Sequence, residues 1–120
     1  MSNPRRDSQY LADIQEAMRR VLNYTDGLSF DAFMEYGMAQ DAVLRNLQVI
    51  GEAAKKLSDD LCASHAAVPW RDMAGLRDRI VHDYFGIDYE VVWDVIENDL
   101  PALLPVIEAI LQEESGAKDG

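Results

Sequence analysis

The sequence has very little cysteine and histidine. Cys62 is the single cysteine, and His65 and His82 are the only histidines. One cysteine can form neither an internal disulfide nor a thiolate metal cluster, and two well-separated histidines do not make a histidine-rich metal site. We therefore expect no metal site and no cofactor, and we interpret Cys62 as a small core residue.

Long apolar runs are absent as well. No stretch of the 120 residues approaches the roughly 18 to 20 apolar residues that a membrane span requires. The first residues lead directly into a polar amphipathic pattern and not into the apolar centre of a signal peptide. We therefore expect a cytoplasmic protein with no membrane partner, folded as a single domain over residues 1–120.

Basic residues are scarce: 11 Lys and Arg stand against 22 Asp and Glu, for a net charge of −11. An acidic chain is poorly matched to the phosphate backbone of nucleic acid. However, residues 87–120 hold nine of the acidic residues and one basic residue, whereas residues 70–86 hold three of each. The segment 70–86 is locally neutral, so the overall acidity does not exclude a nucleic-acid site there.

Apolar residues recur at steps of three and four along most of the chain, which is the spacing of one face of a helix. Four main helices and one short helical turn are predicted, over residues 7–26, 30–36 (the turn), 38–61, 70 to 84 or 85, and 89–112. The tail 113–120 is expected to be frayed. With short connections between the helices, this pattern predicts an all-α fold, an antiparallel up-and-down bundle.

Several residues are placed to cap these helices, to let a neighbouring helix approach closely, or to bend them. Asp7 or Ser8, Ser29 and Asp88 stand at predicted helix starts, where their side chains can cap the backbone. Gly51 interrupts an apolar pattern at a cost of about 1 kcal/mol relative to alanine, which suggests the close approach of another helix. Pro101 and Pro105 should each remove a backbone hydrogen bond and bend the last helix.

The segment 77–84 concentrates reactive side chains on the helix predicted over 70 to 84 or 85. On a continuous helix Arg77 and Tyr84 would share one face, and Asp78 would stack beside His82, four residues on, and orient its ring. Arg79 and Asp83 have the same spacing and would pair. Arg77 and His82, five residues apart, would not converge, so a site built from both is easier to assemble across a dimer.

Arginine binds phosphate in a bidentate manner, and histidine suits acid–base chemistry near neutral pH. Together they suggest phosphodiester cleavage without metal, and a 2′-hydroxyl nucleophile would restrict the substrate to RNA and exclude DNA. The simpler interpretation also stands: an arginine and a histidine on a helix most often form surface or interhelix hydrogen bonds.

The run Arg77-Asp78-Arg79-Ile80-Val81-His82-Asp83-Tyr84 resembles the motif of HepT-like toxins of the HEPN superfamily, in which four residues separate arginine from histidine and one residue separates histidine from tyrosine. Further segments resemble the family in the expected order and extend the similarity over nearly the whole chain: Asp41-Ala42-Val43, Ile50-Gly51-Glu52-Ala53-Ala54, Pro69-Trp70, Val92-Trp93 and Asp99-Leu100-Pro101.

This resemblance implies a helical homodimer that acts as a metal-independent endoribonuclease, the toxin of a type VII toxin–antitoxin pair. Arg77 would bind the scissile phosphate, His82 would be the general base or acid, and Asp78 would support both. The partner would be a minimal nucleotidyltransferase antitoxin that adenylylates Tyr84. Family members more often carry asparagine at the position of Asp78, and an aspartate adds negative charge beside a phosphate site.

A second hypothesis is a non-catalytic helical dimer that binds a nucleotide or a protein partner. The net acidity suits a basic protein partner better than it suits RNA. An adjacent gene for a minimal nucleotidyltransferase, or RNA cleavage by the purified protein, would distinguish the toxin from this binding module.

Overall fold

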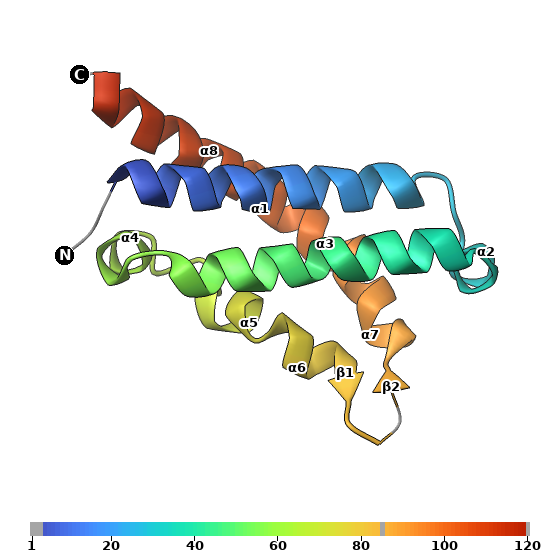
Figure 1. Ribbon diagram of the computed structural model, residues 1–120. Helices are drawn as coiled ribbons and strands as arrows, with labels where there is room; N and C mark the ends of the chain where they lie inside the picture. The colour runs from blue at the N-terminus through green and yellow to red at the C-terminus, as the bar shows by residue number, and fades with distance from the viewer. Residues whose placement is uncertain (1–3, 85, 120) are drawn as a thin grey trace.

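The computed structural model describes residues 4–84 and 86–119, and helices dominate them (Figure 1). The long helices are α1 (Pro4–Thr25), α3 (Gly37–Lys56) and α8 (Leu100–Asp119). In Figure 1, α1 and α3 run antiparallel, while α8 crosses α1 obliquely and ends beside the start of α1. The all-α class predicted from the sequence is confirmed.

The core lies where these long helices meet. The predicted apolar stripes supply it, because one face of each helix turns inward. α2 (Phe30–Glu35) closes one end of the bundle and inserts Phe33, which is fully buried. The largest fully buried side chains are Phe33, Leu11, Ile14, Met18, Leu47, Ile50, Leu100, Ile107, Val21, Val43, Val92 and Val95.

The helix predicted over 38–61 ends earlier than expected. α3 stops at Lys56, and a separate short helix, α4 (Asp59–Ser64), follows. The break has a physical cause in Ser58, whose hydroxyl accepts a hydrogen bond from the Leu61 N–H and caps α4.

Asp7 does not cap α1, which begins at Pro4. The carboxylate of Asp7 accepts hydrogen bonds from the backbone N–H and the hydroxyl of Ser58, at 2.9 and 2.6 Å. Asp7 therefore ties α1 to the junction of α3 and α4.

The continuous helix predicted over 70 to 84 or 85 is wrong, so the third main helix of the predicted bundle is replaced by two short ones. They are α5 (Trp70–Ala74) and α6 (Leu76–Ile80), separated by Gly75. Gly75 caps the end of α5, donating its N–H to the carbonyl of Arg71 at 2.9 Å. The chain then leaves the helix at Val81, whose backbone is extended.

A small β-hairpin follows α6. Strands β1 (Val81–His82) and β2 (Gly86–Ile87) pair antiparallel, with Val81 opposite Ile87 and His82 opposite Gly86. Gly86 has φ +84°, a left-handed conformation that glycine adopts without steric cost. A three-residue loop followed by such a glycine is a common hairpin connection. Phe85, the possible end of the predicted helix, lies outside the described residues.

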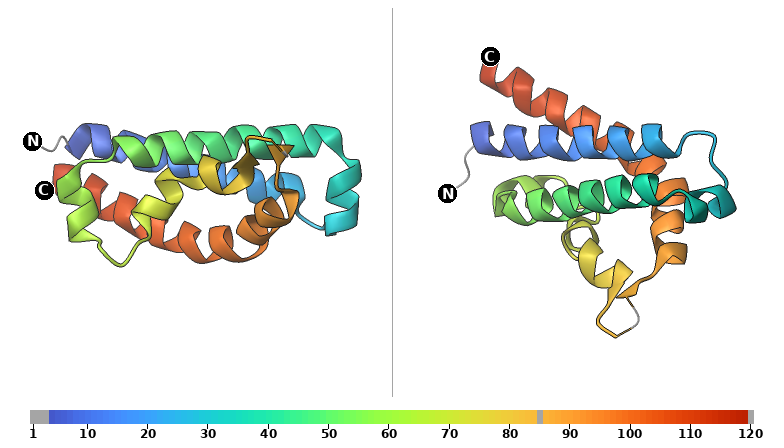
Figure 2. Two further views of the ribbon diagram at one scale, coloured as in Figure 1. Left: turned by 90° about the horizontal axis from the view of Figure 1, so that it is seen from below. Right: turned by 45° about the vertical axis from the view of Figure 1, so that its right-hand side comes forward.

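The last helical segment is continuous but not uniform. α7 (Tyr89–Asp94) passes into a π-helical turn, η1 (Val95–Asp99), and then into α8. Within η1 the N–H of Leu100 donates to the carbonyl of Val95, five residues back, and Pro101 follows at once. The wider turn accommodates the proline ring, and the axis changes direction between α7 and α8 (Figure 2). The bend expected near Pro101 is therefore present.

α8 extends to Asp119 and includes all the described residues of the tail predicted to be frayed; Gly120 lies outside them. Glu113 lies 3.6 Å from the imidazole of His65, which links this part of α8 to the end of α4. No helix among the described residues is long and apolar enough to cross a membrane.

Candidate active site

The hairpin carries His82 and Tyr84 of the predicted motif and joins α6 to α7 at one edge of the molecule (Figure 1). Its base is fixed by a hydrogen bond of 2.7 Å from the N–H of Asp88 to the carbonyl of Ile80, the last residue of α6. His82 stands on β1 and Tyr84 in the connecting loop, whereas Arg77 stays on α6. The motif thus spans a helix, a strand and a turn.

His82 is exposed, and the carboxylate beside its ring belongs to Asp88. Its Nε2 lies 3.4 Å from Oδ2 of Asp88, and the other oxygen of Asp88 accepts the N–H of Val91 at 3.2 Å to cap α7. The predicted stacking of Asp78 on His82 is wrong because α6 ends at Ile80, so spacing by four no longer places residues on one face. The supporting role of Asp78 stays a prediction.

Arg77 and His82 line separate depressions. Arg77 borders a pocket of about 150 Å³ with Leu44, Gln48 and Val81, whereas His82 borders an open depression of about 500 Å³. Ile87 on β2 is common to both. The expectation that the two side chains do not converge within one chain agrees with this arrangement, although the cause is the hairpin and not the helical spacing.

The depression beside His82 combines apolar and acidic groups. Its residues come from α2, both strands of the hairpin and the start of α7. They are Phe30, Met34, His82, Gly86, Ile87, Asp88, Tyr89 and Glu90. Aromatic and apolar walls can stack on a nucleobase, and the carboxylates can accept hydrogen bonds from its amino groups.

Tyr84 has 91% of its surface exposed and lies in the hairpin loop. Such exposure makes its ring accessible to the active site of another protein. The helical face that Tyr84 was predicted to share with Arg77 does not exist, since the helix ends four residues before Tyr84.

Arg79 does not form the predicted pair with Asp83. Its guanidinium lies 3.5 Å from the carboxylate of Asp99, in the π-helical turn. This contact joins α6 to η1, the turn between α7 and α8. An exposed pair of this kind contributes at most about 1 kcal/mol.

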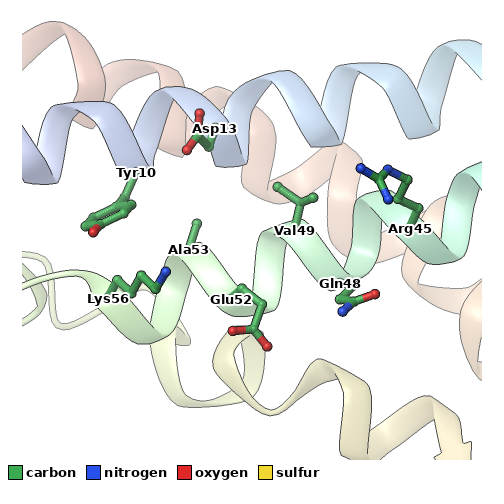
Figure 3. Close-up of a pocket in the computed structure, with 8 residues that line it drawn as sticks. All are labelled: Tyr10, Asp13, Arg45, Gln48, Val49, Glu52, Ala53 and Lys56. Carbon is green, nitrogen blue, oxygen red and sulfur yellow. The ribbon is translucent and has the colours of Figure 1, made fainter.

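A groove between α1 and α3 lies away from the hairpin (Figure 3). Its charged side chains are two acidic ones, Asp13 and Glu52, and two basic ones, Arg45 and Lys56. The ammonium of Lys56 lies 5.9 Å from the centre of the Tyr10 ring. The groove contains no histidine or cysteine, so it lacks a side chain suited to acid–base or nucleophilic chemistry near neutral pH.

Metal ligands are not grouped in the described part of the chain: no three His, Cys, Asp or Glu side chains there are arranged to hold an ion. That the reaction proceeds without a metal ion stays a prediction, which RNA cleavage in the presence of a chelator can test.

Comparison with known proteins assigns the chain to a family. The family described as "Ribonuclease HepT-like" matches residues 14–110, which include the whole hairpin and both of its flanking helices. The chain belongs to the HepT-like ribonuclease family. The family and the enzyme class predicted from the sequence, an endoribonuclease, are therefore confirmed.

The HepT-like chain also has close relatives of the same length class. It is 41% identical to a candidate RNase of Methanocaldococcus jannaschii over 114 residues, covering 94% of each chain. A candidate RNase of Caldanaerobacter subterraneus is 35% identical over 95% of this chain and 99% of its own. A candidate ribonuclease HepT of Thermococcus cleftensis is 39% identical over 82% of this chain and 90% of its own. No solved structure matches the chain.

Asp88 is the neighbour of His82 that sequence reasoning missed. Its position before an apolar helical pattern correctly predicted a cap, but a cap alone gave no reason to connect it with His82. The run Asp83-Tyr84-Phe85-Gly86 between apolar residues is a hairpin signal. With that hairpin in place, Asp88 falls beside the base of β1 and within reach of His82.

Proposed function

We propose that this HepT-like ribonuclease is the toxin of a type VII toxin–antitoxin pair and cleaves RNA internally without a metal ion. Arg77 and His82 are the catalytic residues in this proposal, and Asp78, next to Arg77 on α6, supports them. The carrying observation is the exposure of Arg77, His82 and Tyr84 around one hairpin that interrupts the helical fold.

The proposed reaction uses the 2′-hydroxyl of the substrate as nucleophile. Its oxygen bonds to phosphorus while the bond to the 5′-oxygen breaks, leaving a 2′,3′-cyclic phosphate and a 5′-hydroxyl. His82 accepts the proton of the 2′-hydroxyl, and an acid returns a proton to the departing 5′-oxygen. Arg77 binds the phosphate and stabilises the negative charge that builds up on it.

A second copy of the chain completes this site. The separate depressions of Arg77 and His82 support such a composite cleft, because a single phosphate would need both groups within hydrogen-bond distance. With two copies, the second His82 can serve as the acid for the 5′-oxygen. The homodimer is therefore part of the proposed mechanism.

Tyr84 is the proposed control point. A minimal nucleotidyltransferase antitoxin would transfer adenylate from ATP: the Tyr84 oxygen bonds to the α-phosphorus, pyrophosphate leaves, and the phenol loses its proton. The 91% exposure of Tyr84 supports this role, since the loop can enter another active site. Adenylate two residues from His82 would block RNA sterically and by charge.

The decisive experiment incubates purified protein with total RNA, with and without a chelator, alongside His82→Ala and Arg77→Ala proteins. We expect cleavage that survives chelation and disappears in both variants while circular dichroism and dimer mass are unchanged. Loss of cleavage on chelation would indicate a metallonuclease. A chain that cleaves no RNA at all would support the non-catalytic binding module.

Mixed dimers test the composite site. In a dimer of one Arg77→Ala chain and one His82→Ala chain, an intact Arg77 from one chain can face an intact His82 from the other. Co-expression should therefore restore part of the activity that each variant lacks alone. No restoration would mean either that both residues act within one chain or that the second His82 is required as the acid.

Mass spectrometry tests the modification. Incubation with ATP and the antitoxin should add one adenylate to the wild-type chain and none to Tyr84→Phe. Addition at another residue would overturn the assignment of Tyr84.

A further inference from the structure

Asp88 occupies a fixed position beside the catalytic histidine. Its backbone N–H is held by the carbonyl of Ile80 at 2.7 Å, and Oδ1 is held by the N–H of Val91 at 3.2 Å. The second carboxylate oxygen, Oδ2, lies 3.4 Å from the Nε2 atom of His82, within ion-pair distance. Asp88 is thus anchored through its backbone to the end of α6 and through its carboxylate to the first turn of α7.

The Asp88 contact determines which nitrogen of His82 can accept a proton. A carboxylate only accepts hydrogen bonds, so of the two neutral tautomers of the imidazole it favours the one that carries its proton on Nε2. Nδ1 is then the unprotonated nitrogen. Positioning of this kind, in which one ring nitrogen is held by a carboxylate and the other performs the proton transfer, is a general way to prepare a histidine base.

We propose that Asp88 is a positioning residue for RNA cleavage: it holds His82 in the Nε2-protonated tautomer, which leaves Nδ1 to accept the proton of the 2′-hydroxyl. This inference rests on the proposed role of His82 as the general base. It transfers to Asp88 the orienting function that the sequence suggested for Asp78, and it adds a function to a residue that otherwise only caps α7.

Replacement by asparagine separates the two functions of Asp88. Asparagine caps helices as well as aspartate does, so Oδ1 of Asp88→Asn should keep the N–H of Val91 and α7 should stay intact. The atom that then faces Nε2 of His82 is an amide nitrogen, which donates and does not accept. The variant should therefore favour the opposite tautomer, with the proton on Nδ1.

Two measurements follow on the full-length dimer. Nitrogen-15 NMR of the His82 ring should report the Nε2-protonated form in the wild type and the Nδ1-protonated form in Asp88→Asn. In RNA cleavage, kcat of Asp88→Asn should fall tenfold or more, within the roughly 10²–10⁴ that a positioned acid–base group contributes, while KM changes little. Unfolding by denaturant should match the wild type.

A matched control removes the same charge elsewhere on α7. Asp94 accepts a hydrogen bond from the amide of Asn98 and does not line the His82 depression. Asp94→Asn should therefore keep wild-type kcat and the wild-type tautomer. Equal losses of kcat in Asp94→Asn and Asp88→Asn would show that the loss of one negative charge lowers kcat wherever it lies, which would overturn the proposal.

The remaining outcomes distinguish this inference from the function on which it rests. Full activity or an unchanged tautomer in Asp88→Asn overturns the positioning role while leaving His82 as the base. Undiminished cleavage by His82→Ala overturns the proposed site itself. In that case the NMR result still decides whether Asp88 sets the tautomer of the ring.

Discussion

The hairpin should depend on the backbone conformation of Gly86 more than on any side chain of its loop. Gly86 has φ +84°, and a Cβ built there meets nothing within 4 Å. Gly86→Ala therefore introduces backbone strain without a steric clash. It perturbs the position of His82, its partner in the β ladder, without touching the ring.

The size of the effect follows from that geometry. A residue other than glycine in the left-handed region costs about 1–2 kcal/mol. The ladder has two residue pairs, so the chain can relieve the strain by opening the hairpin instead of unfolding the bundle. A shift of that size reduces the ratio of ordered to open hairpin by a factor of about 5–30. RNA cleavage should fall by up to the same factor.

Gly27 offers a matched control. It has φ +77°, its Cβ would also meet nothing within 4 Å, and it lies in the α1–α2 connection away from the hairpin. Gly27→Ala should lose about 1–2 kcal/mol of stability in denaturant unfolding and keep its activity. Gly86→Asn should recover part of the activity, because asparagine tolerates the left-handed region better than alanine.

The measurements are initial rates of RNA cleavage and denaturant unfolding of the three variants and the wild type. Gly86→Ala with wild-type cleavage would refute the proposal that the hairpin positions His82 for catalysis. Equal loss of activity in Gly27→Ala would show that general stability, and not local geometry, limits the rate.

Three further predictions concern the scaffold. A Cβ on Gly51 would lie 3.5 Å from the nearest atom, a carbonyl oxygen of α5, which is an ordinary contact distance. Gly51→Ala should therefore raise the free energy of unfolding by about 0.5–1 kcal/mol. A free energy of unfolding below that of the wild type would show that α3 and α5 cannot accommodate the added methyl group. Asp7→Ala leaves the N–H of Ser58 without its buried acceptor and should lower the free energy of unfolding by about 1–3 kcal/mol in the same assay. An unchanged free energy of unfolding would show that the contact between α1 and the α3–α4 junction does not stabilise the fold. Burial, followed by the charges of Asp59 and Asp7, raises the pKa of the Cys62 thiol above 9.0. Iodoacetamide should therefore modify Cys62 more slowly in the folded protein than in the unfolded chain near neutral pH, and Asp59→Asn should accelerate the reaction. Equal rates in the folded and unfolded states would contradict the raised pKa.

Much of the scaffold could be predicted because local and tertiary preferences agree there. In α1 the spacing of Leu11, Ile14 and Met18 defines one face, and all three side chains are fully buried. Ser29 and Asp88 were identified as caps because short polar side chains satisfy the first free N–H groups of a helix regardless of the surrounding fold. The family could be inferred as well, since the motif is a pattern of residue types in order.

The end of α6 could not be predicted from periodicity. Ile80, Val81 and Tyr84 continue the helical spacing, although the chain leaves the helix after Ile80. Strands of two residues are too short to show an alternating pattern, so the helical period prevailed over the hairpin signal of the loop and Gly86.

The sequence alone thus determined the helical class, the apolar faces and the residue types of the site. Only the tertiary structure decided how those residues are arranged, because the reversal of the chain at the hairpin depends on hydrogen bonds between its two sides. That reversal separates Arg77 from His82 into two depressions and exposes Tyr84. It also brings Asp88, six residues along the chain from His82, to within 3.4 Å of the ring.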